Sequence, residues 1–136
     1  MNKKEEEYLR LKERGFLATL GKNGNPTIVP VCFAYSNGAI YTAIDEKPKS
    51  SRVPARLTNI ERDSRVAFII DNYSQNWEKL SYLLVHGKAR VVENQREVEK
   101  AKSLLIGKYP QYRRLKLGEQ VIEISVDRTK LWEFDG

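Results

Sequence analysis

Residues 39–73, AIYTAIDEKPKSSRVPARLTNIERDSRVAFIIDNY, place two strand-like runs on either side of a basic loop. Apolar and β-branched residues predict strands over 39–44 and 65–72, and a short amphipathic piece predicts a helix over 56–62. The rest of the chain is interpreted outward from this strand, loop, helix and strand.

The basic loop carries Lys47, Lys49 and Ser50, and Arg56 stands at the start of the expected helix. Charged donors, a hydroxyl and the free N–H groups of a helix start are what a phosphate group requires. The loop is therefore the predicted anion site, with a plain solvated loop as the alternative. It contains neither GxxxxGK[ST] nor GxGxxG, the patterns of the common nucleotide-binding loops.

Before this stretch, residues 16–20 and 27–35 are expected to form strands joined by the turn at 21–26, whose Asn-Gly pair accepts positive φ. Pro30 cannot donate to a strand ladder, so its strand is expected at an edge or a bulge. A second turn at 36–38 leads into the strand at 39–44. Two closely spaced hairpins indicate an antiparallel barrel or sandwich.

After this stretch, Gly87 is expected to bend or bulge a long strand over 81–93. The first five strands are expected in meander order. The remaining elements are predicted from hydrophobic spacing, as helices over 3–14, ending at Gly15, and 95–106, and strands over 120–126 and 130–134. The fold class is mainly β with helices.

A chain of 136 residues with net charge +6 is expected to form one domain, residues 1–136, with an anionic partner. One Cys and one His exclude the usual Cys/His metal sites, and Cys32 is interpreted as a small buried hydrophobe. The absence of a long apolar run or an export signal predicts a cytoplasmic protein that does not enter a membrane.

Trp77 and Lys79 follow the strand expected over 65–72 and form a possible stacking surface, although Trp77 packing on its own loop is the alternative. The lone His86 is interpreted as structural. No Ser/His/Asp or Cys/His arrangement is visible by spacing, so no catalytic side chain is assigned. Enzymatic chemistry in such a chain belongs to a bound cofactor.

Two runs carry a family resemblance, GFLATLGKNGNPTIVPVCFAYSNGAIYTAIDEKPKSS at 15–51 and RLTNIERDSRVAFIIDNYSQNWEKLSYLLVHGKARVVE at 56–93. Together they resemble the pyridoxamine 5'-phosphate oxidase-like split β-barrel superfamily, and most of all its F420-dependent subgroup. The resemblance implies a six- to seven-stranded antiparallel split barrel, the FMN-binding split barrel, and a homodimer with two cofactor sites in the cleft between the chains.

Carried over by position, the resemblance assigns roles to eleven residues. The cofactor ring and its side chain would lie against Val29, Pro30, Val31, Thr42 and Ala43. The phosphate would be held by Lys47, Lys49, Ser50 and Arg56, although the insertion SSRVPA interrupts the family pattern there. The partner chain would contribute Trp77 and Lys79.

The expected function is an oxidoreductase that binds FMN or coenzyme F420 and passes a hydride to or from a small organic substrate. The acidic tail of F420 suits the net charge and the extra bases Arg52, Arg113, Arg114 and Lys116, whereas FMN has a single phosphate. The ending DRTKLWEFDG lacks the basic segment with which pyridoxamine phosphate oxidases bind substrate. A non-catalytic flavin-binding protein is the alternative, and nucleic-acid binding through YRRLKL is a more distant one, so no nucleic acid is expected.

Overall fold

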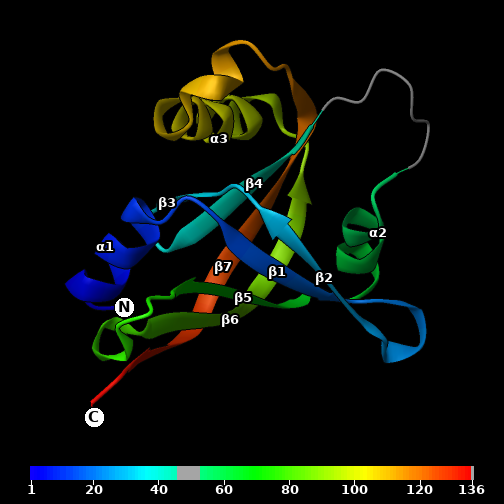
Figure 1. Cartoon of the computed structure of the whole chain (residues 1–136). Helices are drawn as coiled ribbons and strands as arrows, with labels where there is room; N and C mark the ends of the chain where they lie inside the picture. The colour runs from blue at the N-terminus through cyan, green and yellow to red at the C-terminus, as the bar shows by residue number, and fades with distance from the viewer. Residues whose placement is uncertain (46–52, 136) are drawn as a thin grey trace.

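The computed structural model describes residues 1–45 and 53–135, with the backbone alone at Asp45 (Figure 1). One antiparallel sheet of seven strands runs in the order β2-β1-β5-β6-β7-β4-β3. Its strands are β1 (Gly15–Leu20), β2 (Pro26–Val31), β3 (Ala34–Ser36), β4 (Ala39–Asp45), β5 (Arg65–Asn72), β6 (Ser81–Val92) and β7 (Leu117–Glu133).

The two edge strands of this sheet, β2 and β3, follow one another in the chain and are separated only by Cys32 and Phe33. The sheet therefore curls back on itself, so that its two edge strands are joined by a short crossing. These two strands do not pair with each other, which makes the sheet a split barrel (Figure 1). This confirms the predicted fold class. The expected meander order is wrong, because β1 pairs with β5 and β4 pairs with β7.

Two predicted strand boundaries are also wrong. The strand expected over 27–35 breaks at Cys32 and Phe33, where the chain crosses from one sheet edge to the other. The two strands expected over 120–126 and 130–134 are one strand, β7, of 17 residues, which pairs with β6 from Val121 to Glu133 and with β4 over its first half. Pairing with β6 carries the strand through the polar residues that suggested a break.

Three α-helices flank the sheet, α1 (Lys3–Leu11), α2 (Ala55–Arg62) and α3 (Gln95–Lys108). α1 ends at Leu11 and not at Gly15, which opens β1 and packs against the ring of Phe68. α3 packs on β3, β4 and β7, whereas α2 packs on β1 and β6. Short 3-10 turns complete the chain at η1 (Lys22–Gly24), η2 (Trp77–Lys79) and η3 (Pro110–Arg113).

The core lies inside the barrel, where alternate strand residues point inward. Phe33 and Phe68 meet edge to face there, with ring centroids 4.9 Å apart. Leu57 and Ile60 of α2 join the same cluster, so α2 closes one end of the barrel. Asn59 fixes that helix to the β1–β2 hairpin by donating to the hydroxyls of Thr19 and Thr27, at 3.0 and 2.9 Å.

None of the helices described here is long and apolar enough to cross a membrane.

Candidate functional site

The first group of predicted site residues lies on β2, an edge strand as Pro30 predicted. Val29 and Val31 face the core, whereas Pro30 is exposed and stands opposite Phe16 of β1. Of these three predicted residues, only Pro30 therefore has a side chain open to a ligand at this edge.

The ladder between β1 and β2 determines which backbone groups are open. Proline has no N–H, so the Pro30–Phe16 pair falls at a non-hydrogen-bonded position of the antiparallel ladder. Two residues earlier, Ile28 occupies the same kind of position opposite Ala18. The N–H and C=O of Ile28 and the C=O of Pro30 therefore point away from β1, along the free edge of the sheet.

The second group, Thr42 and Ala43 on β4, points to opposite faces of the sheet, as consecutive strand residues must. Thr42 is 1% exposed and lies on the face of Ile40 and Ile44, which belong to the barrel core. Ala43 packs beneath α3 with Leu105. The structure therefore does not bring these two side chains to one surface, and a shared ligand could contact only one of them or their backbone.

The third group is the predicted phosphate loop. Lys47, Lys49 and Ser50 lie outside the described residues. Arg56 is half-buried in the first turn of α2, and the N-cap of that helix is Pro54, which makes no side-chain cap. The Leu57 N–H donates to the Pro54 carbonyl at 3.1 Å, and the positive end of the helix dipole at this start favours an anion.

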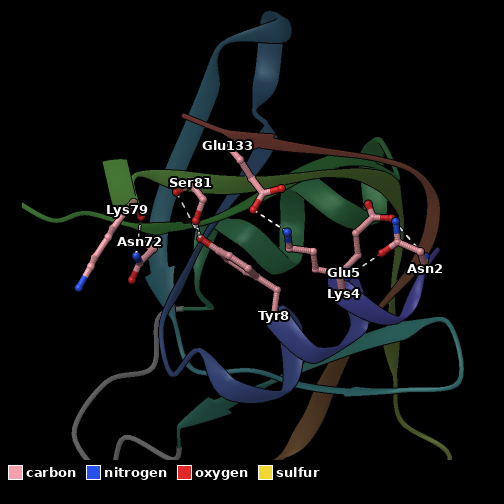
Figure 2. A network of polar contacts seen from close by, with 8 residues as sticks. All are labelled: Asn2, Lys4, Glu5, Tyr8, Asn72, Lys79, Ser81 and Glu133. Atoms are coloured by element: carbon pink, nitrogen blue, oxygen red, sulfur yellow. Dashed lines mark hydrogen bonds and ion pairs between the residues drawn. The ribbon is translucent and has the colours of Figure 1, made fainter. Parts of the chain in front are cut away.

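The fourth group, Trp77 and Lys79, lies on the connection between β5 and β6. The indole of Trp77 is 61% exposed, which contradicts the alternative that it packs on its own loop. The connection is nevertheless fixed: Asn76 caps η2 through the Glu78 N–H, and Asn72 Nδ2 donates to the Lys79 carbonyl at 2.9 Å (Figure 2). An exposed indole on an ordered connection is placed to contact another molecule.

A polar network beside this connection holds α1 on the sheet (Figure 2). The Tyr8 hydroxyl contacts the carbonyl and Oγ of Ser81 at 3.2 and 3.0 Å, and Lys4 Nζ pairs with Glu133 Oε2 at 2.7 Å. Lys12 Nζ also donates to Asn72 Oδ1 at 2.7 Å. The N-terminal helix thus supports the connection that carries Trp77. The charged residues of this helix did not indicate such a role in the sequence.

Arg56 and Trp77 do not meet within one chain. β5 separates them, since it starts at Arg65 just after α2 and ends at Asn72 where the Trp77 connection begins. Figure 1 shows α2 and this connection at opposite ends of β5. A site that uses both residues needs two copies of the chain.

Sequence reasoning missed Lys108 and Tyr109, which fill the split between β2 and β3. The Tyr109 hydroxyl accepts from the Phe33 N–H at 3.0 Å and faces the carbonyls of Glu13 and Phe33 at 2.8 and 3.0 Å. Lys108 Nζ donates to the Leu9 carbonyl at 3.1 Å and lies 3.7 Å from the centre of the Phe33 ring. The partner Phe33 lies at least 75 residues before these two residues in the sequence, and Leu9 and Glu13 lie more than 90 residues before them. No local sequence pattern therefore indicates these contacts.

Burial shifts the titration of both groups. It lowers the pKa of Lys108 to about 8, partly offset by the nearby Glu13 carboxylate and Cys32. Burial also raises the pKa of Tyr109 to about 12, although the hydrogen bond from the Phe33 backbone acts to lower this pKa. Within the described residues, no three His, Cys, Asp or Glu side chains gather as a metal site would require.

A curled antiparallel sheet of seven strands, split between β2 and β3, defines a split β-barrel protein. The chain belongs to the pyridoxamine 5'-phosphate oxidase family, whose model matches residues 1–133.

Individual proteins are similar to this chain in sequence or in fold. A 5a,11a-dehydrotetracycline/5a,11a-dehydrooxytetracycline reductase of Streptomyces rimosus is 31% identical over 97 residues, 65% of this chain, and the match spans 62% of the length of that relative. A conserved hypothetical protein of Mycobacterium tuberculosis superposes with a TM-score of 0.77 at 23% identity, covering 98% of this chain and 85% of the other. An FAD-binding protein of Mesorhizobium loti gives 0.70 at 16% identity, covering 96% and 94%.

Proposed function

We propose that this chain is an oxidoreductase that binds FMN or coenzyme F420 between two identical copies and transfers a hydride to or from a small organic substrate. In this proposal residues 1–136 form a single cofactor-binding domain. The observation that carries it is the free edge of β2, where Ile28 and Pro30 present backbone donors and acceptors to the outside of the sheet.

This edge suits the chemistry of a flavin or deazaflavin ring. The pyrimidine end of such a ring carries an N–H donor between two carbonyl acceptors. The Ile28 N–H can donate to one ring carbonyl, and the carbonyl of Ile28 or Pro30 can accept from the ring N–H, and strand backbone supplies both groups without any particular side chain. This edge therefore matches two of the three polar groups at this end of the ring, and the second ring carbonyl requires a donor from another part of the site.

The phosphate end of either cofactor would be held at the start of α2. Arg56 supplies a charge-assisted donor, and the N–H groups of the first helical turn face the same end of the helix. We assign Lys47, Lys49 and Ser50 to the same phosphate as part of the proposal.

The names of two relatives support the oxidoreductase class. One is a reductase of an unsaturated tetracycline, and the other binds FAD, a flavin. When bound, a flavin or deazaflavin supplies the hydride chemistry itself. The residues of this chain then need only orient the ring, neutralise the phosphate and exclude water, so the proposal requires no acid or base from a side chain.

The proposed homodimer uses the outer face of β2, β1, β5 and β6. Consecutive strands of this face carry apolar side chains at outward positions, and Ile28 is 63% exposed there. The outward set is Phe16, Ala18, Ile28, Pro30, Ala67, Ile69 and Leu84. A face of this kind is typical of an obligate interface between subunits.

In the proposed dimer each cofactor site combines Arg56 of one copy with Trp77 and Lys79 of the other. This division follows from the opposite placement of α2 and the Trp77 connection within one chain. The indole would stack on the ring or close the substrate side of the cleft.

The first test is titration of the purified protein with FMN and with F420. Micromolar or tighter binding of one cofactor is expected, and reduction or oxidation of that cofactor by candidate substrates distinguishes an enzyme from a flavin carrier. Binding of neither cofactor at micromolar concentrations contradicts the proposal.

A mixing experiment tests the shared site. Arg56→Ala and Trp77→Ala proteins are each expected to bind cofactor weakly, because every site lacks one of its two contributors. When the two are unfolded, mixed in equal amounts and refolded, roughly a quarter of the sites regain both residues. Refolding each variant alone is the control, and no recovery in the mixture overturns the two-chain site.

A further inference from the structure

A pocket of about 570 Å³ lies at the end of the sheet where β6 begins and β7 ends. One wall is the connection between β5 and β6, with Asn76, Trp77 and Glu78, and the other is the segment after β7, with Phe134 and Asp135. These five residues define the Trp77 pocket. Its volume suits a small molecule.

Backbone hydrogen bonds hold the two walls of the Trp77 pocket together. The Leu80 N–H donates to the Trp77 carbonyl at 3.1 Å, and the Phe134 N–H donates to the Leu80 carbonyl at 3.0 Å. Within the first wall, Asn76 Oδ1 accepts from the Glu78 N–H at 3.2 Å. Leu80 thus joins the walls, so the pocket has a defined shape before a ligand arrives.

Aromatic side chains gather at this end of the sheet. Both tryptophans of the chain are here, since Trp132 pairs with Tyr82 across the β6–β7 ladder and their rings stack with centroids 5.5 Å apart. In the pocket itself, Trp77 is exposed and Phe134 is half-buried. The pocket thus offers an indole and a phenyl ring, whose faces attract flat rings and cations.

The charge of the Trp77 pocket is opposite to that of the whole chain. Glu78 and Asp135 supply two exposed carboxylates, and no base is among the described residues that line it. Within the described part of the chain neither carboxylate forms an ion pair, whereas Glu133 nearby is paired with Lys4 at 2.7 Å (Figure 2). A chain of net charge +6 repels cations at long range, so these unpaired acids beside aromatic rings favour a cation locally.

Other ligand classes fit this pocket less well. A metal ion needs further ligands, and no three His, Cys, Asp or Glu side chains gather among the residues for which the structure gives positions. An anion would meet the two carboxylates. Lys79 follows Glu78 in the chain, but Figure 2 shows its side chain extending away from Glu133. The lining therefore favours an organic cation that carries a flat ring.

We propose that the Trp77 pocket binds the substrate, and that the substrate is a small organic cation in which a protonated or quaternary nitrogen belongs to a flat unsaturated ring system. The inference rests on the proposed function, in which Trp77 reaches the cofactor of the partner chain. Trp77 and Phe134 contact the ring, and Glu78 and Asp135 pair with the charged nitrogen. The turn that reaches the cofactor thus places the substrate ring beside it.

The first test measures the binding of three flat probes to the natural protein by calorimetry, without cofactor. The probes are 1-methylquinolinium, a cation, quinoline, which is neutral at about pH 8, and 2-naphthoate, an anion. The cation is expected to bind most tightly. The double variant Glu78→Gln/Asp135→Asn should lose about tenfold or more in affinity for 1-methylquinolinium and keep its affinity for quinoline. Its melting temperature should not change, since both side chains are exposed.

The matched control is Glu61→Gln/Glu99→Gln, which removes the same charge from exposed positions of α2 and α3 outside the pocket. Equal loss in both double variants, or equal affinity of the natural protein for the three probes, overturns the inference. An arginine-rich peptide that binds more tightly than 1-methylquinolinium also overturns it, because the pocket would then be a protein-binding surface.

The second test uses the protein loaded with whichever cofactor it binds. Saturating 1-methylquinolinium is expected to change the fluorescence of the bound cofactor, because the two rings lie side by side. Unchanged fluorescence overturns the role of the pocket as the substrate site. If the natural protein binds neither FMN nor F420, the proposed function fails, while selective binding of 1-methylquinolinium that is lost in the pocket variant still supports a cation pocket.

Discussion

The hydroxyl of Tyr109 forms hydrogen bonds with backbone groups that the split in the sheet leaves without partners on a neighbouring strand. Phe33 lies in the crossing from β2 to β3, and its buried N–H and C=O both meet this hydroxyl. The Glu13 carbonyl, just before β1, meets it as well. A single side chain from the end of α3 thus replaces the ladder bonds that a closed barrel would have made here.

Tyr109→Phe is expected to destabilise the fold by about 1–3 kcal/mol, since it leaves the buried Phe33 N–H without its acceptor and removes no ring. Urea unfolding measures this change. Tyr73→Phe is the control, because the Tyr73 side chain is 70% exposed and its hydroxyl should contribute almost nothing. Similar losses in the two variants would contradict the role given to Tyr109.

Lys108 gives a pH dependence whose sign follows from its lowered pKa of about 8. At lower pH both folded and unfolded chains carry the proton, so the full cost of burying the charge opposes folding. As the pH rises from about 8 toward the ordinary value of 10.5, the folded chain loses the proton first and this cost disappears.

The natural chain should therefore gain stability relative to Lys108→Met between about pH 7 and about pH 9.5. Urea midpoints of both proteins at the two pH values measure the gain. Lys100→Met, at an exposed position of the same helix, should show a constant difference from the natural chain. If the urea midpoints of Lys108→Met and of the natural chain differ by the same amount at both pH values, the lowered pKa of Lys108 is contradicted.

At the scale of elements, β6 bends at one register shift between His86 and Gly87. Gly87 fits there because a Cβ would lie 2.2 Å from the Ser125 carbonyl oxygen of β7. The absence of a side chain allows the two strands to approach closely while β6 curves around the barrel.

Gly87→Ala is expected to destabilise the protein by about 1–3 kcal/mol, because backbone must move to relieve the overlap. Gly107→Ala is the matched control: no atom lies within 4 Å of its added Cβ, and the position is helical. There alanine should stabilise the fold by about 0.5–1 kcal/mol. Thermal unfolding of the two variants tests this contrast. Changes in stability of the same sign in both variants would contradict this interpretation of the bulge.

Local signals predicted the elements well where one pattern dominated. The bounds of β5, the Asn-Gly turn, the edge position of Pro30 and the bulge at Gly87 all agree with the structure. The break at Cys32 and Phe33 was not predictable, because both residues suit a strand and the crossing depends on where the sheet edges lie. Strand order was not predictable either, since it depends on β7, far away in sequence.

At the scale of the whole molecule, the outer face of β2 and β1 decides the proposed assembly. Ile28→Lys places a charge on each side of a symmetric interface, and dimerisation should weaken at least about 100-fold. Sedimentation velocity across protein concentrations measures this. Leu11→Lys is the control, since Leu11 is apolar and 69% exposed but lies on α1, away from this face. A dimer that survives Ile28→Lys would place the interface elsewhere.

The candidate site shows the same division between what sequence predicts and what it leaves open. Residue types and order indicated the family and the edge at Pro30. They did not show that Thr42 and Ala43 face opposite sides, or that Arg56 and Trp77 lie at opposite ends of β5. Such relations depend on strand pairing between distant segments, which a single sequence does not specify.

The pairing of β7 has a consequence for the chain during its synthesis. In the described sheet the neighbours of β4 are β3 and β7, and β7 is synthesised after the other six strands. The β1, β2, β5 and β6 segments can pair as they emerge, whereas the β3–β4 hairpin must wait with its apolar residues uncovered. Closure of the barrel must therefore wait for the synthesis of residues 117–133, and a nascent chain that stops before residue 117 holds only part of the sheet.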